Sequence, residues 1–245
     1  MSFSILIQAA GGLALFLLAM GMMTDGLKTF AGAGLKRLLE RWTDRPLRGV
    51  ASGALITGVV QSSSAVTVAT IGFVNAGMLT LTQAIAVVFG ANVGTTVTSW
   101  LVAMVGSGFK ISALALPILT VGVILRIAGT GGRWASLGEA LAGFGLFFLG
   151  LDLLKESLGG FAGGFSASVE GGDGAHWATY LGIGFLITLL TQSSSATLAI
   201  VLTAAGTGVI GIEAGAAGVI GASLGTTSTA AIAVLNATAN ARRLA

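Results

Sequence analysis

The chain has 245 residues, of which 54% are hydrophobic and 9% are charged, and its formal net charge is +3. This composition excludes a soluble catalytic domain, and the zero cysteines exclude disulfides, thiolate catalysis and cysteine-ligated metal sites. Apolar runs at 3–23, 111–125 and 137–151 predict an all-α integral membrane protein, whose basic residues orient it in the bilayer rather than bind nucleic acid.

The first elements are two helices and a pair of short apolar segments. Residues 3–23 are long enough to cross the bilayer, and 26–43 read as an amphipathic helix at the interface. The segments 49–60 and 65–77 are each too short to span, and Gln-Ser-Ser-Ser at 61–64 lies between them. They form either one continuous helix with polar residues at its middle or a re-entrant hairpin with the serines at its tip. We favour the hairpin.

A longer apolar segment with an internal polar run follows. Residues 83–105 are long enough to cross, but Gly-Ala-Asn-Val-Gly-Thr-Thr occupies 90–96 near their centre. Because glycine permits turns that a side chain would forbid, this run predicts a transmembrane helix broken at membrane depth. A further crossing is expected at 111–127, after Lys110.

The whole pattern occurs twice, at a constant offset of 131 residues. Gln61 to Ala65 recurs as Gln192 to Ala196, and the Gly-Thr-Thr run recurs at 221–227. An ungapped comparison of 12–98 with 143–229 gives 26 identities in 87 pairs, where this composition would give roughly one in ten by chance. The predicted units are 1–142, the first repeat, and 143–245, the second, which lacks the counterpart of its last helix.

Charge indicates how the repeats are oriented. With hairpins, one repeat contributes three crossings, an odd number, so the second repeat is inverted relative to the first. Threading inward from residue 3 puts ten Lys and Arg residues in the cytoplasm and only Lys110 and Lys155 outside. The loop at 34–48 is basic, whereas its counterpart at 165–179 has no Lys or Arg. The positive-inside rule therefore favours inverted-topology repeats with re-entrant helical hairpins and broken transmembrane helices.

The predicted breaks lie near the midplane of the bilayer. Non-helical backbone is tolerated there only if protein, water or a ligand forms hydrogen bonds with its N–H and C=O groups. Each serine cluster supplies hydroxyls and the N–H groups at the start of a helix, which suit an anion. Each Gly-Thr-Thr run supplies carbonyl and hydroxyl oxygens, which suit Na⁺. Between 47 and 104 only Arg48 is charged, and between 180 and 235 only Glu213 is. Neutral donors would therefore hold a small oxyanion, with Na⁺ offsetting its charge.

Packing is the alternative interpretation of these residues. Serine and threonine in membrane helices commonly bond to a carbonyl one turn earlier, and Gly-x-x-x-Gly commonly marks helix packing. Gln61 and Gln192 are either braces for the broken backbone or direct ligands. The run at 221–225 also matches the G-x-S-x-G nucleophile elbow, but that motif needs a strand-turn-helix and a partnering base. We expect no enzyme.

Paired Gln-Ser-Ser-Ser motifs, each followed by a Gly-Ala-Asn-x-Gly-Thr-Thr type motif, resemble the type II sodium/phosphate cotransporters and their bacterial relatives, over nearly the whole chain. The resemblance implies Na⁺-coupled symport of inorganic phosphate by alternating access, in a multi-pass protein of the cell inner (plasma) membrane. It implies Na⁺ as the coupling ion, with no other cofactor and no transition metal.

The resemblance also implies the residues of the site. The substrate-binding residues would be those of both Gln-Ser-Ser-Ser motifs: Gln61, Ser62, Ser63, Ser64, Gln192, Ser193, Ser194 and Ser195. The sodium-binding residues would come from the Gly-Thr-Thr runs: Asn92, Thr95, Thr96, Ser223, Thr226 and Thr227. Ser223 stands where the family often has Asn.

Bacterial relatives often continue into further helices and a PhoU-like cytoplasmic domain. We therefore expect a homodimer, a missing C-terminal segment or a PhoU-like partner to complete the protein in the lipid bilayer. A Na⁺-coupled carrier of another small oxyanion and a non-transporting membrane scaffold are the alternatives. An ion channel fits less well, because the polar clusters are confined to the midplane.

Overall fold

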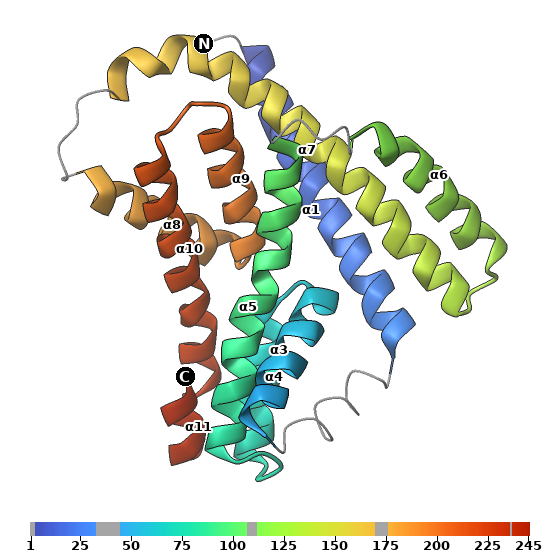
Figure 1. Cartoon of the computed structure of the whole chain (residues 1–245), viewed down its shortest axis with the longest axis vertical. Coiled ribbons are helices and arrows are strands. Elements are labelled where there is room, and N and C mark those ends of the chain that lie inside the picture. Colours follow the sequence, from blue (N-terminus) through green and yellow to red (C-terminus); the bar gives the residue numbers. More distant parts are fainter. Residues whose placement is uncertain (1–2, 33–44, 107–111, 170–175, 236) are drawn as a thin grey trace.

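The computed structural model describes residues 3–32, 45–106, 112–169, 176–235 and 237–245, and every regular element in these ranges is an α-helix (Figure 1). Within these ranges, four helices are long and apolar enough to cross a bilayer: α1 (Phe3–Ala31), α5 (Leu81–Gly106), α7 (Arg133–Val169) and α10 (Ile212–Ala233). The others are shorter: α3 (Pro46–Val60), α4 (Ser63–Asn75), α6 (Ser112–Ala128), α8 (His176–Thr191), α9 (Ser194–Gly206) and α11 (Ala239–Leu244). The predicted all-α membrane protein is confirmed at this level.

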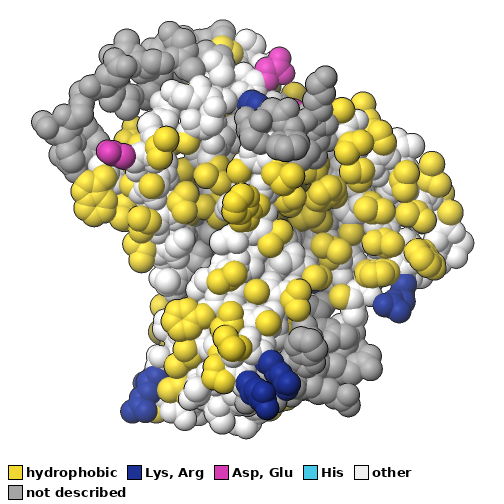
Figure 2. All heavy atoms as spheres, viewed as in Figure 1, with side chains coloured by type: hydrophobic (Ala, Val, Ile, Leu, Met, Phe, Trp, Pro, Cys, Tyr) yellow, Lys and Arg dark blue, Asp and Glu magenta, His cyan; other side chains and the backbone are white. Residues whose placement is uncertain are grey.

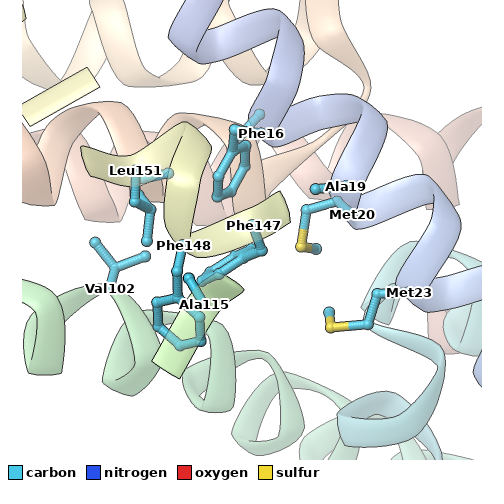
Figure 3. Close-up of a cluster of buried hydrophobic side chains, with 11 residues drawn as sticks. Phe16, Ala19, Met20, Met23, Val102, Ala115, Phe147, Phe148 and Leu151 are labelled. Carbon is cyan, nitrogen blue, oxygen red and sulfur yellow. The ribbon is translucent and has the colours of Figure 1, made fainter. Parts of the chain in front are cut away.

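Helices α1 and α7 pack along one another, and α6 lies along α7 (Figure 1). Small residues bring the two backbones together, since a Cβ added at Gly143 would lie 2.5 Å from the Met23 nitrogen. The rings of Phe16 and Phe147, both fully buried, pack with their centroids 5.1 Å apart (Figure 3). This contact joins two residues that are 131 positions apart.

The largest cluster of buried apolar side chains in the described part of the chain surrounds this crossing (Figure 3). Its members come from α1, α5, α6, α7 and α9: Phe16, Ala19, Met20, Met23, Val102, Ala115, Phe147, Phe148, Leu151, Ala196 and Ala199. In lipid, helices are held together by close van der Waals packing of this kind. Lipid tails are as apolar as the side chains, so there is no hydrophobic driving force for helices to associate. The cluster therefore fixes α1 and α7 relative to each other.

The Gly-Thr-Thr runs do not break their helices, so this prediction is wrong. Helix α5 continues through 90–96 and α10 through 221–227. The reason is helix packing: a Cβ at Gly90 would overlap the carbonyl oxygen of Val50 on α3, and one at Gly221 would overlap that of Leu181 on α8. Continuous helices keep their carbonyls hydrogen-bonded internally, so the expected exposed carbonyl ligands are not formed.

The Gln-Ser-Ser-Ser motifs do interrupt the helices, as predicted, and the continuous-helix alternative is wrong. Helix α3 ends at Val60 and α4 begins at Ser63, while α8 ends at Thr191 and α9 begins at Ser194. These four helices have 13 to 16 residues each, fewer than the roughly 20 that cross a bilayer. Helices α4 and α9 begin 131 residues apart, as do α5 and α10.

Other expectations meet the structure only in part. Helix α1 continues to Ala31, so the first part of the expected interfacial helix belongs to α1, and 33–44 lie outside the described residues. The expected crossing at 111–127 is α6, a helix of 17 residues. The boundary between 142 and 143 falls inside α7, and the whole of the loop counterpart at 165–179 lies in α7, in α8 or outside the described residues.

Charged and apolar side chains separate along the molecule. On the face shown in Figure 2, hydrophobic side chains cover the middle, most Lys and Arg lie toward the lower end, and Asp and Glu lie toward the upper end. Exposed apolar residues are normal for a surface that faces lipid and costly for one that faces water. The surface pattern agrees with helices that cross a membrane.

Candidate functional site

The two Gln-Ser-Ser-Ser motifs meet at one cavity of about 210 Å³. All eight predicted substrate-binding residues line it: Gln61, Ser62, Ser63, Ser64, Gln192, Ser193, Ser194 and Ser195. The rest of the described lining is one face of α1, formed by Leu17, Met20, Gly21 and Thr24. The motifs are 131 residues apart in sequence, so only the tertiary fold brings them together.

The first motif turns on Gln61, which ends α3 in the left-handed conformation with φ of 54°. Its backbone N–H donates to the Thr57 carbonyl oxygen at 2.6 Å. Its side-chain Nε2 donates to the Gly58 carbonyl oxygen, and its Oε1 accepts a hydrogen bond of 2.6 Å from Thr98 Oγ1 on α5. Both ends of the amide therefore bond to protein, which favours the brace over the direct ligand.

The second motif repeats this arrangement at Gln192, where φ is 53°. Gln192 Nε2 donates to the Leu189 carbonyl oxygen at 2.6 Å. Its Oε1 accepts from Thr229 Oγ1 on α10 at 3.4 Å, a longer bond than its counterpart. Gln192 is exposed, so this second brace is the weaker of the two.

The next residue of each motif caps the helix that follows. Ser62 and Ser193 have extended backbones, and their hydroxyl oxygens accept from the N–H of Ala65 at 3.2 Å and of Ala196 at 3.3 Å. A capping hydroxyl keeps its hydrogen, which remains able to donate. The N-termini of α4 and α9, with their partial positive charge, therefore begin in residues of the same cavity.

The cavity is uncharged, and its lining combines polar groups with the apolar surface of α1. None of the described residues that line it is ionisable, and the serines, the glutamines and Thr24 supply its polar side chains. Hydroxyl and backbone donors at two helix N-termini attract a negative ion without the desolvation cost of burying a cationic side chain. The arrangement suits a small anion and offers no nucleophile with a partnering base.

The six predicted sodium-binding residues lie on α5 and α10, and the described lining of the cavity includes none of them. Thr95 Oγ1 donates to the Ala91 carbonyl oxygen at 3.1 Å, and Thr226 Oγ1 donates to that of Ala222 at 3.2 Å. Thr96, Thr227 and Ser223 likewise donate to carbonyls of their own helices. These bonds match the packing alternative for hydroxyl residues in membrane helices.

Sequence reasoning missed two groups of residues at this site. Thr98 and Thr229, which hold the glutamines, are identical in the two repeats, and that identity was a usable signal. The α1 wall gave no such signal, because Gly21 and Thr24 have charged residues at the equivalent positions of the second repeat. Only the packing of α1 beside the motifs reveals their place.

Comparison with known proteins identifies the family of the chain. The family model of the Na⁺/Pi-cotransporters matches residues 15–156 and 175–244, which is most of the chain. The chain therefore belongs to the Na⁺/Pi-cotransporter family, a family of transporters and not of enzymes. No solved structure gives a significant match to the chain.

Three relatives show how far the likeness extends. "Uncharacterized protein YqeW" of Bacillus subtilis is 30% identical over 241 residues, which are 95% of this chain and 74% of that protein. "Putative inorganic phosphate export protein YjbB" of Escherichia coli is 28% identical over 242 residues, 98% of this chain and 44% of the relative. "Sodium-dependent phosphate transport protein 2A" of Oryctolagus cuniculus is 40% identical over 63 residues, 26% of this chain and 10% of the relative. The chain spans less than half of YjbB.

Proposed function

We propose that this member of the Na⁺/Pi-cotransporter family carries inorganic phosphate across a membrane together with Na⁺, with phosphate bound in the cavity between the two serine motifs. The observation that carries the proposal is that two helix N-termini and two serine clusters, far apart in sequence, line one uncharged cavity. Its volume of about 210 Å³ is large enough for a small oxyanion.

In this proposal the serines and the glutamines of the two motifs have different roles. The serine hydroxyls and the first N–H groups of α4 and α9 donate to phosphate oxygens. Gln61 and Gln192 hold the two turns in the left-handed conformation and act as braces. Because the donors are neutral, the site favours phosphate most when Na⁺ is nearby.

The proposed sodium residues are those on α5 and α10: Asn92, Thr95, Thr96, Ser223, Thr226 and Thr227. Since both helices are continuous, Na⁺ would be held by side-chain oxygens and not by exposed carbonyls. A threonine that donates its hydrogen to a carbonyl keeps lone pairs for a cation. Moving one net positive charge inward gains about 2.3 kcal/mol per 100 mV, which provides the driving force.

We further propose that the two halves are inverted repeats that exchange conformations by alternating access. Three observations support this: the helix offsets of 131 residues, the Phe16–Phe147 contact between equivalent residues, and the charge separation in Figure 2. Inverted repeats with a site at their interface are a common plan of secondary transporters. The hairpins would then be re-entrant, because their helices are too short to span.

The direction of transport has two candidates. The sequence resemblance favours uptake driven by an inward Na⁺ gradient, whereas the name of YjbB describes phosphate export. Proteoliposomes separate the two, since labelled phosphate can be placed inside or outside and the Na⁺ gradient imposed in either direction. Uptake is contradicted if phosphate moves only outward.

The central experiment is labelled phosphate uptake into proteoliposomes with and without a Na⁺ gradient. Wild type is expected to require Na⁺, and Ser194→Ala to lose most of its uptake. Ser228→Ala is the matched control, because Ser228 lies on α10 and donates to the Gly225 carbonyl oxygen at 2.7 Å. Uptake that ignores Na⁺ removes symport, and a fully active Ser194→Ala removes the proposed site. Competition by other oxyanions tests the alternative cargo.

We place the protein in the plasma membrane, as a multi-pass protein, and expect a homodimer or an additional helical or PhoU-like segment to complete it. Helix α6 packs on α7. Sizing in detergent tests the dimer, and a stable, active monomer contradicts it.

A further inference from the structure

The cavity has a wall that comes from only one repeat. Leu17, Gly21 and Thr24 on α1 line it. Their helix has a counterpart in α7, but Phe148 and Leu151, the equivalents of Leu17 and Met20, are buried in the core cluster. The described lining of the cavity takes no residue from α7. Both repeats therefore contribute a Gln-Ser-Ser-Ser motif to the cavity, but only the first repeat contributes a helix face to its described lining.

Gly21 is the residue of this wall with unused space. A Cβ added at Gly21 meets nothing within 4 Å, although Gly21 lines the cavity. Glycine within a helix costs about 1 kcal/mol relative to alanine, and it is usually repaid by close packing, as at Gly26, where a Cβ would lie 2.5 Å from the Ala140 nitrogen. Gly21 gains no such packing. The absence of a side chain at Gly21 therefore leaves space in the cavity beside the two serine motifs.

The wall is held rigidly. Met20, between Leu17 and Gly21, is 9% exposed and belongs both to the lining and to the core cluster, and Met23 is 4% exposed. The Phe16–Phe147 contact anchors the preceding turn (Figure 3). Because packed cores resist deformation, α1 cannot easily retreat from a larger cargo.

We propose that Gly21 and Thr24 determine the specificity of the site: Gly21 limits the size of the oxyanion, and the Thr24 hydroxyl donates to it. This inference rests on the proposed function. Thr24 is half-buried, and in the described lining it carries the only hydroxyl that comes from α1. Gly21 and Thr24 lie three residues apart and so share one face of the helix.

Gly21→Ala tests the size limit, with phosphate and arsenate as the probes. Arsenate has the same charge and shape as phosphate but longer bonds to oxygen. We expect Gly21→Ala to raise the half-saturation concentration for phosphate about tenfold, the lower end of the effect of one methyl group in a binding pocket, and that for arsenate by a larger factor. Gly21→Ser, a second small side chain, is expected to act in the same direction.

Gly11→Ala is the matched control. Gly11 is also an exposed residue of α1 and its added Cβ also meets nothing within 4 Å, but the described lining of the cavity does not include it. Its half-saturation concentrations are expected to equal those of wild type. If Gly21→Ala and Gly21→Ser equal wild type for both anions, Gly21 does not limit the cargo.

The hydroxyl is tested by Thr24→Val and Thr24→Ser. Valine keeps the shape and loses the donor, so phosphate affinity is expected to fall about tenfold, whereas serine is expected to retain it. Equal affinity in both variants contradicts the role of Thr24. A wild type that takes up neither anion contradicts the proposed function and this inference together, whereas an active wild type with unaltered variants contradicts this inference alone.

Discussion

Thr98 Oγ1 donates a 2.6 Å hydrogen bond to Gln61 Oε1, which ties helix α5 to the turn between α3 and α4. Thr98 is 1% exposed, so its hydroxyl has little access to other partners. The bond explains how a non-glycine residue stays in the left-handed conformation, where most side chains are unfavourable. The conformation of the turn between α3 and α4 therefore depends on Thr98, a residue outside the motif.

We expect Thr98→Val to destabilise the protein by about 1–3 kcal/mol, because the Gln61 amide oxygen loses a buried partner. Phosphate uptake should fall with it, while Thr98→Ser should retain both properties. Thr229→Val should have the smaller effect, since its bond to Gln192 is 3.4 Å long and exposed. Thermal unfolding in detergent and uptake measure the two effects.

Thr96→Val is the control for this prediction. The Thr96 hydroxyl is exposed and bonds to the Val93 carbonyl oxygen of its own helix at 2.7 Å. Its loss should leave the melting temperature nearly unaltered. A Thr98→Val protein as stable as Thr96→Val would show that the Gln61 brace contributes nothing.

Two substitutions of Ser62 distinguish its role in capping α4 from its proposed role in binding the anion. Ser62→Ala should cost about 1 kcal/mol of stability, because Ala65 N–H loses its cap. Ser62→Asp should retain the cap, since aspartate is a good N-cap residue, yet place a carboxylate in the anion cavity. We therefore expect Ser62→Asp to unfold at a temperature near that of wild type and to lose phosphate uptake. Phosphate uptake at the wild-type level in Ser62→Asp would place the anion elsewhere.

The packing glycines should tolerate no side chain. Gly90→Ala would push a methyl group into the Val50 carbonyl oxygen of α3, and we expect a loss of about 1–3 kcal/mol in stability. Gly72→Ala is the matched control on α4, where an added Cβ meets nothing within 4 Å, and it should be neutral or stabilising by up to about 1 kcal/mol. Melting temperatures in detergent compare them. Equal stability of the two variants would contradict close packing of α3 on α5.

Thr57 and Thr188 occupy equivalent positions, and their substitutions should have opposite signs. Thr188 Oγ1 donates to Thr197 Oγ1 at 2.7 Å, but the residue equivalent to Thr197 is Val66, and Thr57 Oγ1 finds no partner among the residues that the structure describes. A buried hydroxyl without a partner costs stability, whereas a paired one contributes.

Thr57→Val is therefore expected to be neutral or stabilising, and Thr188→Val to destabilise by about 1 kcal/mol. Val66→Thr should stabilise, because it offers Thr57 the partner that Thr188 already has. Thermal unfolding of the three variants decides. A strong loss of stability in Thr57→Val would mean that its hydroxyl binds water or an ion.

The helix breaks at Gln61 and Gln192 could be predicted from sequence, because the short apolar segments 49–60 and 65–77 flank a serine cluster and that cluster recurs at a fixed offset. The breaks at 90–96 and 221–227 were predicted wrongly for a physical reason. A glycine that permits a turn and a glycine that admits a neighbouring helix look the same in sequence. The carbonyl of Val50 against Gly90 distinguishes them, and it comes from another helix.

The sequence by itself determined that the chain is a helical membrane protein, that its motifs are duplicated and that both are uncharged, because composition, periodicity and offset are properties of the chain alone. The tertiary structure decided that Ser62 and Ser193 cap helices at one cavity, that Thr98 and Thr229 hold their glutamines, and that Gly21 and Thr24 form a wall beside them. Contacts between residues far apart depend on how helices pack, and packing is set by the shapes of surfaces that no local pattern encodes.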